Sequence, residues 1–377
     1  MGVVAGDGPE VPASAGVLTG GLRVVRMDRV DEPSIVAEAA RRRAAAAWLW
    51  ATVLLTAGAF IAAEVLAPPA SAAPPRGLVW LLFLGASVHV ASTGWLARFP
   101  EVRAHAARHL TRYVGVPVGL IVGGAVAAAL CPTSKLAWVI LPYFAWQFFH
   151  FQKQNLGMAA LAAASRRVAA LRTVERRALM SAGVAGIVGL LARPGLLQLR
   201  LDPRMGALFA GAGVVFAGAV GTGLVALVLR PATDRPLAFC VVYLLALLFS
   251  LPIFVCTSPY ASVGGMTVAH GLQYLLLMGL VAGRSRWSAS RTLPVVVFVN
   301  LALIGGVALS AASHLHDAGP AGRLVFGAYL GVVTAHFVVD AGVWRLRDPF
   351  PRSFVGRYLP FLHPAHVASQ ARLPIDR

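Results

Sequence analysis

Long apolar segments recur along this chain and constrain its fold more than any other feature. Each is about 20 residues long, enough for a helix to cross the hydrocarbon core of a bilayer, and they repeat between residues 45 and 344. Charged residues make up only 13% of the chain, against about 25% in a typical soluble domain. The polar sequence that remains is too short to build a sizeable soluble domain. The sequence therefore predicts an all-α, polytopic transmembrane helical bundle.

We predict about ten membrane spans from these segments, with ends placed to within a few residues. The fifth span is the shortest. The predicted spans are Ala45–Ala67, Gly77–Leu96, Tyr113–Leu130, Leu136–Leu156, Leu179–Ala192, Met205–Leu229, Leu237–Val255, Gly265–Ala282, Leu293–Ala312 and Leu324–Trp344.

Arginines set the expected orientation, because positively charged loops stay in the cytoplasm. Arg41–Arg43 precede the first span, and more arginines follow the second, fourth, sixth, eighth and tenth spans. This asymmetry predicts cytoplasmic N- and C-termini, although the loop from Arg193 to Arg204 departs from it with three arginines on the other side. The high Arg, Ala and Gly content suggests a bacterial protein, which would place the chain in the inner membrane. The expected organisation is a cytosolic tail over residues 1–44, a transmembrane domain over 45–346 and a cytosolic or interfacial tail over 347–377.

The formal net charge of +18 could suggest a nucleic-acid partner. Arginine-rich cytoplasmic loops explain the charge better, and we predict no nucleic-acid binding. The three cysteines, Cys131, Cys240 and Cys256, show no metal-binding or redox spacing.

Four histidines fall inside predicted spans, and three of them have polar neighbours at helical spacing. They are His89, His150, His270 and His336. At a rise of about 1.5 Å per residue, His89, His150 and His336 each lie about 18–21 Å from the outer end of their span, and His270 lies about 20 Å from the inner end of its own. The four imidazoles are therefore expected in one layer of the membrane.

This layer favours a metal site. Asp340 follows His336 by one helical turn, so the two share a helix face. Imidazole suits iron, copper and zinc, and histidines with a carboxylate suit non-haem iron and oxygen chemistry. We predict the four histidines as metal ligands, Asp340 as a ligand or base, and Tyr274 as a second catalytic group. Gln154 and Gln273 would orient the imidazoles. Iron is the expected metal, with copper, zinc or haem as alternatives.

Two other functions remain open for the same residues. Ionisable groups inside a membrane also serve proton-coupled transport, in which His336 and Asp340 would titrate. The histidines could instead be interhelical hydrogen-bond partners in a structural membrane protein. The preferred hypothesis is a metal-dependent oxidoreductase or oxygenase whose partners are the lipid bilayer and a hydrophobic small-molecule substrate.

The spacing of His89, His150 and His270 resembles that of the Brp/Blh membrane proteins. The resemblance implies an intramembrane iron oxygenase, because that family cleaves β-carotene to retinal with iron held by membrane-embedded histidines. It covers roughly Ser87 to Tyr274 in spacing alone. That family has an H-x-x-x-H pair where this chain has His270 followed by Tyr274, and the segment His336–Asp340 has no counterpart in it.

Other histidines are weaker candidates. His105 and His109 form an H-x-x-x-H pattern in a predicted cytoplasmic loop, and His363 and His366 lie in the C-terminal tail. Membrane desaturases and hydroxylases use cytosolic histidine boxes, but they need adjacent His-His pairs, which this chain lacks. The outer-loop residues His314 and His316 are expected to be solvated. Aromatic residues around His150, among them Trp146, indicate either a lipid-facing belt or a wall for a hydrophobic substrate.

Overall fold

The computed structural model describes residues 32–68, 73–199, 201, 205–285, 290, 292–359 and 361–362. The chain divides into two compact units, Met1–Glu38 and Ala39–Arg377. Within the first unit, the described residues are the first turns of helix α1. The account below concerns the second unit. Most of the predicted N-terminal tail, together with His363 and His366, lies outside the described residues.

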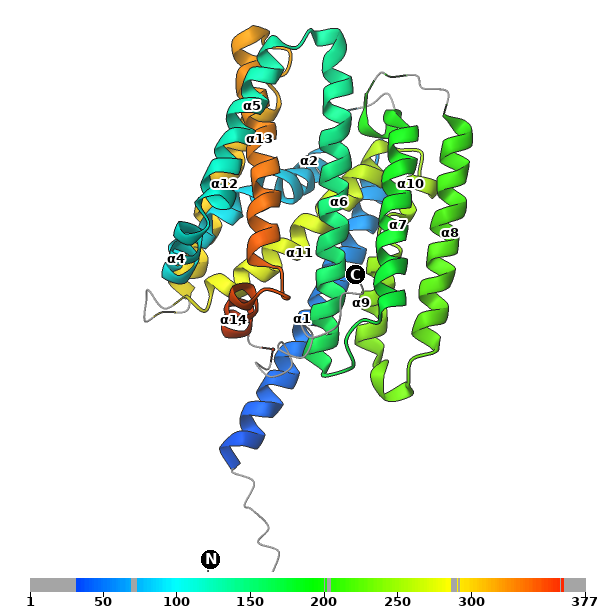
Figure 1. The fold of residues 1–377 in the computed structure, drawn as a ribbon, viewed down its shortest axis with the longest axis vertical. Helices are drawn as coiled ribbons and strands as arrows, with labels where there is room; N and C mark the ends of the chain where they lie inside the picture. The colour runs from blue at the N-terminus through cyan, green and yellow to red at the C-terminus, as the bar shows by residue number, and fades with distance from the viewer. Residues whose placement is uncertain are drawn as a thin grey trace, which may run out of the picture. The chain divides into compact units, whose positions relative to one another are not determined.

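The described chain is helical and contains no strand, which confirms the all-α prediction (Figure 1). Its α-helices are α1 (Glu32–Leu66), α2 (Arg76–Leu82), α3 (His89–Ser92), α4 (Pro100–Arg108), α5 (Val116–Leu130), α6 (Thr133–Arg166), α7 (Thr173–Ala192), α8 (Gly206–Val228), α9 (Leu237–Leu247), α10 (Leu251–Val255), α11 (Gly265–Ala282), α12 (Thr292–Ser313), α13 (Gly319–Val343) and α14 (Pro349–Tyr358). Short π turns are η1 (Phe83–Val88), η3 (Thr111–Gly115) and η6 (Tyr260–Gly264), and short 3₁₀ turns are η2 (Thr93–Arg98), η4 (Pro194–Leu197) and η5 (Ala232–Asp234).

Among the described residues, seven helical segments are long and apolar enough to cross a membrane. This identifies a multi-pass membrane protein, and each of the seven overlaps a predicted span. They are Val36–Leu66, Arg76–Arg98, Thr111–Leu130, Gly206–Val228, Tyr260–Ala282, Thr292–Ser313 and Gly319–Val343.

The three other predicted spans lie on helices that are not continuous apolar segments. Helix α6 has 34 residues, continues ten residues past the predicted end at Leu156, and carries several polar side chains around His150. Helix α7 starts with the charged sequence Glu175–Arg177. The span predicted over Leu237–Val255 is divided into α9 and α10, because the helix ends after Leu247 and Pro252 occupies the first turn of α10. A count of ten membrane crossings remains a prediction.

Glycines allow two pairs of helices to approach closely. Helices α5 and α13 lie side by side (Figure 1), and a Cβ on Gly124 would lie 2.6 Å from the Gly327 carbonyl oxygen. In the second pair, Gly85 of η1 lies against α11, where a Cβ on Gly85 would lie 2.5 Å from the Cα of Val268 and a Cβ on Gly271 would meet the Gly85 backbone. Small residues at such contacts are typical of membrane helices, whose association depends on packing.

A buried ion pair joins α7 to the segment after α8. Glu175 is fully buried, and its Oε1 accepts a hydrogen bond of 2.7 Å from Arg230 Nε. Arg230 also donates to the carbonyl oxygens of Ala169 and Ala170. These bonds satisfy a charged pair that would otherwise be costly to bury.

Candidate functional site

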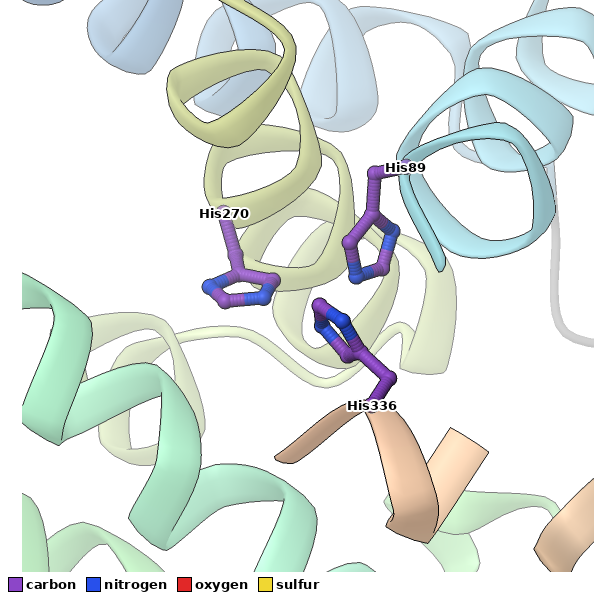
Figure 2. A group of neighbouring side chains, drawn as sticks. All are labelled: His89, His270 and His336. Carbon is purple, nitrogen blue, oxygen red and sulfur yellow. The ribbon is translucent and has the colours of Figure 1, made fainter. Parts of the chain in front are cut away.

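The structure brings the four predicted intramembrane histidines together. His89 comes from the start of α3, His150 from α6, His270 from α11 and His336 from α13. All four are buried, with exposed fractions between 0 and 8%. Figure 2 shows the rings of His89, His270 and His336 turned toward one another from three separate helices. We call these four residues the histidine cluster.

The four imidazoles form a closed ring of neighbours. Ring centroids are 5.0 Å apart for His89 and His270 and 5.0 Å for His270 and His150. The distance is 5.1 Å from His150 to His336 and 5.2 Å from His336 back to His89. Each of the four rings therefore has two other imidazoles of the cluster as neighbours at nearly the same distance.

Local backbone features explain why His89 meets His270. His270 immediately precedes Gly271, and His89 follows Gly85 by four residues, about one helical turn. The Gly85–Gly271 contact therefore fixes the distance between the backbone segments that carry the rings of His89 and His270. Gly85 lies within the π turn η1, which ends directly before His89, and single π turns of this kind often occur at functional sites.

The Nε2 atoms of all four histidines are buried and have no hydrogen-bond partner among the described residues. An unpaired buried polar atom is costly, and native structures contain few of them. Four such atoms in one cluster are consistent with a shared ligand.

Asp340 lies at one edge of the cluster. Its Oδ2 is 3.6 Å from His336 Nε2 and 3.9 Å from His150 Nε2. The other carboxylate oxygen, Oδ1, accepts a hydrogen bond of 2.8 Å from the Tyr274 hydroxyl. Both Asp340 and Tyr274 are almost fully buried, with exposed fractions of 4% and 1%. The carboxylate is thus oriented by Tyr274 and faces two imidazoles.

Thr93 connects Tyr274 to the cluster. Its Oγ1 lies 3.0 Å from the Tyr274 hydroxyl oxygen and 2.6 Å from His336 Nδ1. The sequence places Thr93 one helical turn after His89 but does not reveal its contact with His336, because that contact joins η2 to α13 across 243 positions of sequence separation.

Gln154 and Gln273 lie beside the cluster in a second hydrogen-bonded chain. The Gln154 side chain donates to the His270 carbonyl oxygen and to Gln273 Oε1, each at 3.0 Å. Gln273 in turn donates to the Thr56 hydroxyl at 2.9 Å. Neither glutamine bonds an imidazole nitrogen of His270, since both ring nitrogens lack a partner in the described structure. These residues connect α6, α11 and α1 and hold the backbone that carries His270.

Aromatic rings cover the cluster. Phe151 stacks on His270 with centroids 4.0 Å apart, and Phe337 stacks on His150 at 4.5 Å. Trp146 contacts Phe337 at 6.0 Å and has an exposed fraction of 39%. His150, with 8%, is the most exposed of the four cluster histidines.

The weaker histidine candidates lie elsewhere. His105 and His109 are neighbours on and just after α4, with ring centroids 4.5 Å apart, and His105 stacks on Phe350 at 4.0 Å. Burial, with nearby His109 and arginines, lowers the pKa of His105 from its ordinary value of 6.5. His316 pairs with the exposed Asp317 at 3.1 Å.

The donor set fits a metal ion. Among the described residues, two groups could hold one, namely His89 with His270 and His336, and His150 with His336 and Asp340. Within each group the ligand atoms lie within 4.8 Å of one another. A zinc–imidazole bond is about 2.0–2.1 Å long, so small side-chain rotations would bring these atoms to one ion.

Comparison of the chain with protein-family models, with curated proteins and with solved structures finds no match. The site itself therefore provides the evidence about function. The structure defines a multi-pass helical membrane protein with a buried histidine and aspartate cluster.

Proposed function

We propose that the protein is a metal-dependent membrane oxidoreductase, with iron as its metal, that acts on a lipid-soluble substrate. The observation that carries this proposal is the set of four buried Nε2 atoms without hydrogen-bond partners among the described residues, on four imidazoles that are neighbours. Neutral imidazole offers a lone pair at such an atom, and histidine is the commonest metal ligand in proteins.

The donors favour iron among the common metals. The cluster supplies imidazole nitrogens and one carboxylate, with no cysteine in either group. Thiolate ligands would favour zinc, copper(I) or iron–sulfur clusters, whereas histidines with a carboxylate suit non-haem iron. When bound, such an ion would supply oxygen activation.

Each residue has a proposed role. His89, His150, His270 and His336 would hold the ion. Asp340, 3.6 Å from His336 Nε2, would complete the ligand set or accept a proton from the substrate. Tyr274 orients the Asp340 carboxylate through its 2.8 Å hydrogen bond and is close enough to share in proton movement.

The surroundings support a lipid-soluble substrate. His89, His270 and His336 lie inside helical segments apolar enough to span a membrane. On the side of His150 the cluster is covered by aromatic rings, with Phe337 on His150 and the half-exposed Trp146 in contact with Phe337. A hydrophobic molecule dissolved in the bilayer would find apolar rings to pack against on this side of the cluster.

The topology belongs to the same proposal. Seven apolar helices together with α6, α7 and the α9–α10 pair would give ten crossings of a bacterial inner membrane. An even number places both termini on one side, and the arginine distribution favours the cytoplasm.

The test is metal content, measured by plasma mass spectrometry on protein purified in detergent. We expect about one ion per chain in the wild type, and its loss in His150→Ala and His336→Ala. His316→Ala is the matched control, because His316 also lies beside an aspartate but far out in an exposed loop. Wild-type protein that binds no metal, even after reconstitution with ferrous iron, would overturn the proposal and favour proton-coupled transport or a structural role.

A further inference from the structure

Four polar groups form one continuous hydrogen-bonded chain along the edge of the histidine cluster. It runs from His336 Nδ1 to Thr93 Oγ1 at 2.6 Å, from Thr93 to the Tyr274 hydroxyl at 3.0 Å, and from Tyr274 to Asp340 Oδ1 at 2.8 Å. The chain joins η2, α11 and α13, so it connects three separate segments of the fold.

Counting hydrogens assigns a direction to this chain. A tyrosine hydroxyl has a single hydrogen, and that of Tyr274 is donated to Asp340. The contact between Tyr274 and Thr93 then needs the hydroxyl hydrogen of Thr93. With its only hydrogen used, Thr93 can accept but not donate at His336, so the hydrogen in that 2.6 Å contact must lie on His336 Nδ1.

We infer that Thr93 is a positioning residue that fixes the tautomer of His336. With its hydrogen on Nδ1, the ring of His336 carries a lone pair on Nε2, the atom that lies near Asp340 and has no hydrogen-bond partner among the described residues. A hydrogen bond at one ring nitrogen sets which form the other nitrogen takes. Thr93 thereby prepares His336 to bind a metal without being a ligand itself.

The opposite direction is chemically possible and predicts the other tautomer of His336. A protonated Asp340 would donate to Tyr274, Tyr274 to Thr93, and Thr93 to His336 Nδ1. His336 would then carry its hydrogen on Nε2, pointing into the cluster. In either direction Nε2 lies 3.6 Å from Asp340 Oδ2 and has no hydrogen-bond partner among the described residues, so the two directions differ in which His336 nitrogen carries the hydrogen, and the tautomer measurement separates them.

The benefit for metal binding rests on the proposed function, but the tautomer does not. It is a property of the metal-free protein, and nitrogen NMR of histidine-labelled protein in lipid bilayers distinguishes a protonated Nδ1 from a protonated Nε2. The His336 signals are assigned by their disappearance in His336→Gln.

Two substitutions at Thr93 provide the comparison, measured on metal-free protein washed with a chelator. Thr93→Val keeps the shape of the side chain but removes the hydroxyl, whereas Thr93→Ser keeps the hydroxyl. We expect wild type and Thr93→Ser to show protonated Nδ1 at His336, and Thr93→Val to lose that preference. The iron affinity should fall about 10–100-fold in Thr93→Val and stay near wild type in Thr93→Ser.

Tyr274→Phe tests the next link and serves if Thr93→Val does not fold. It removes the acceptor for the Thr93 hydrogen, which can then turn to His336 Nδ1, so the preference should again weaken. Protonated Nε2 at His336 in the wild type, or an unchanged tautomer in both Thr93→Val and Tyr274→Phe, would overturn the inference. The outcomes separate the two proposals, because the expected tautomers without any metal binding would refute the metal site alone.

Discussion

Phe337 lies flat on the ring of His150, with centroids 4.5 Å apart and planes inclined by 23°. The two residues belong to α13 and α6, and Phe337 is almost fully buried while the neighbouring Trp146 is half exposed. Phe337 therefore covers the most exposed of the cluster histidines and lies between His150 and the exposed ring of Trp146.

Removing this layer should open the cluster. We expect Phe337→Ala to lower the free energy of unfolding by about 3–5 kcal/mol, because a large buried ring is lost. A bound metal should also be extracted faster by a chelator, measured as the rate of metal release. Phe149→Ala is the control, because Phe149 is next to His150 on α6 but has an exposed fraction of 39%. Equal rates for both variants would contradict a covering role.

The close contact between η1 and α11 should not tolerate a side chain. Gly271→Ala places a methyl group against the Gly85 backbone, which would force His89 and His270 apart. We expect a loss of about 1–3 kcal/mol in the free energy of unfolding, together with reduced metal content. In Gly279→Ala, on the same helix but with nothing within 4 Å of the added methyl, stability should stay constant or rise slightly. Thermal unfolding in detergent compares the two, and similar losses would argue against the contact.

The buried pair of Glu175 and Arg230 should be sensitive to removal of one charge. Glu175→Gln leaves the Arg230 guanidinium, which has an exposed fraction of 3%, without a carboxylate. The expected destabilisation is about 3–5 kcal/mol. Glu101→Gln is the comparison, because it removes the charge that pairs with the exposed Arg357 at 3.3 Å but keeps a side-chain oxygen that can accept from Tyr358. This variant should change stability by about 0–1 kcal/mol. Equal losses in the free energy of unfolding, measured with denaturant, would show that the buried pair contributes no more to stability than the exposed pair.

Acidification should weaken the contact between α4 and α14. Burial lowers the pKa of His105, helped by His109 and nearby arginines, so the folded protein favours the neutral ring stacked on Phe350. A lowered pKa in the folded state means that this contribution to stability is complete above the ordinary value of 6.5 and is lost as the pH falls through the folded pKa. The protection of α14 amides against hydrogen exchange, corrected for the intrinsic pH dependence of exchange, should therefore fall between neutral and mildly acidic pH, and His105→Gln should remove most of that change. An unaltered pH response in the variant would assign it to another group.

Much of the fold follows from the sequence, because transmembrane helices can be recognised by their length and hydropathy. Each of the seven apolar helices was expected near its observed position. The break between α9 and α10 was not expected, because the residues from Leu237 to Val255 are apolar except for Ser250, and Pro252 alone signals the end of a helix. The extension of α6 to Arg166 was also missed, because it consists of small residues with little periodicity.

The cluster histidines could be chosen from the sequence because the rise per residue converts position into depth. That argument places His89, His150, His270 and His336 in one layer, and the structure shows them as neighbours. Depth does not reveal which helices are adjacent or how they are rotated. The sequence therefore did not predict the contact of Thr93 with His336 or that of Phe337 with His150. It also led us to expect the glutamines to bind imidazoles, whereas Gln154 donates to the backbone carbonyl of His270.

The contact between Gly85 and Gly271 places backbone against backbone, with no side chain between the two helices. The spacing of His89 and His270 is consequently set by main-chain atoms, which are the same for every amino acid. Residues elsewhere on η1 and α11 could be exchanged widely in a randomised library while the distance between the two rings stayed constant. Selection for a working site in such a library should leave the two glycines almost invariant and allow the lipid-facing positions around them to diversify.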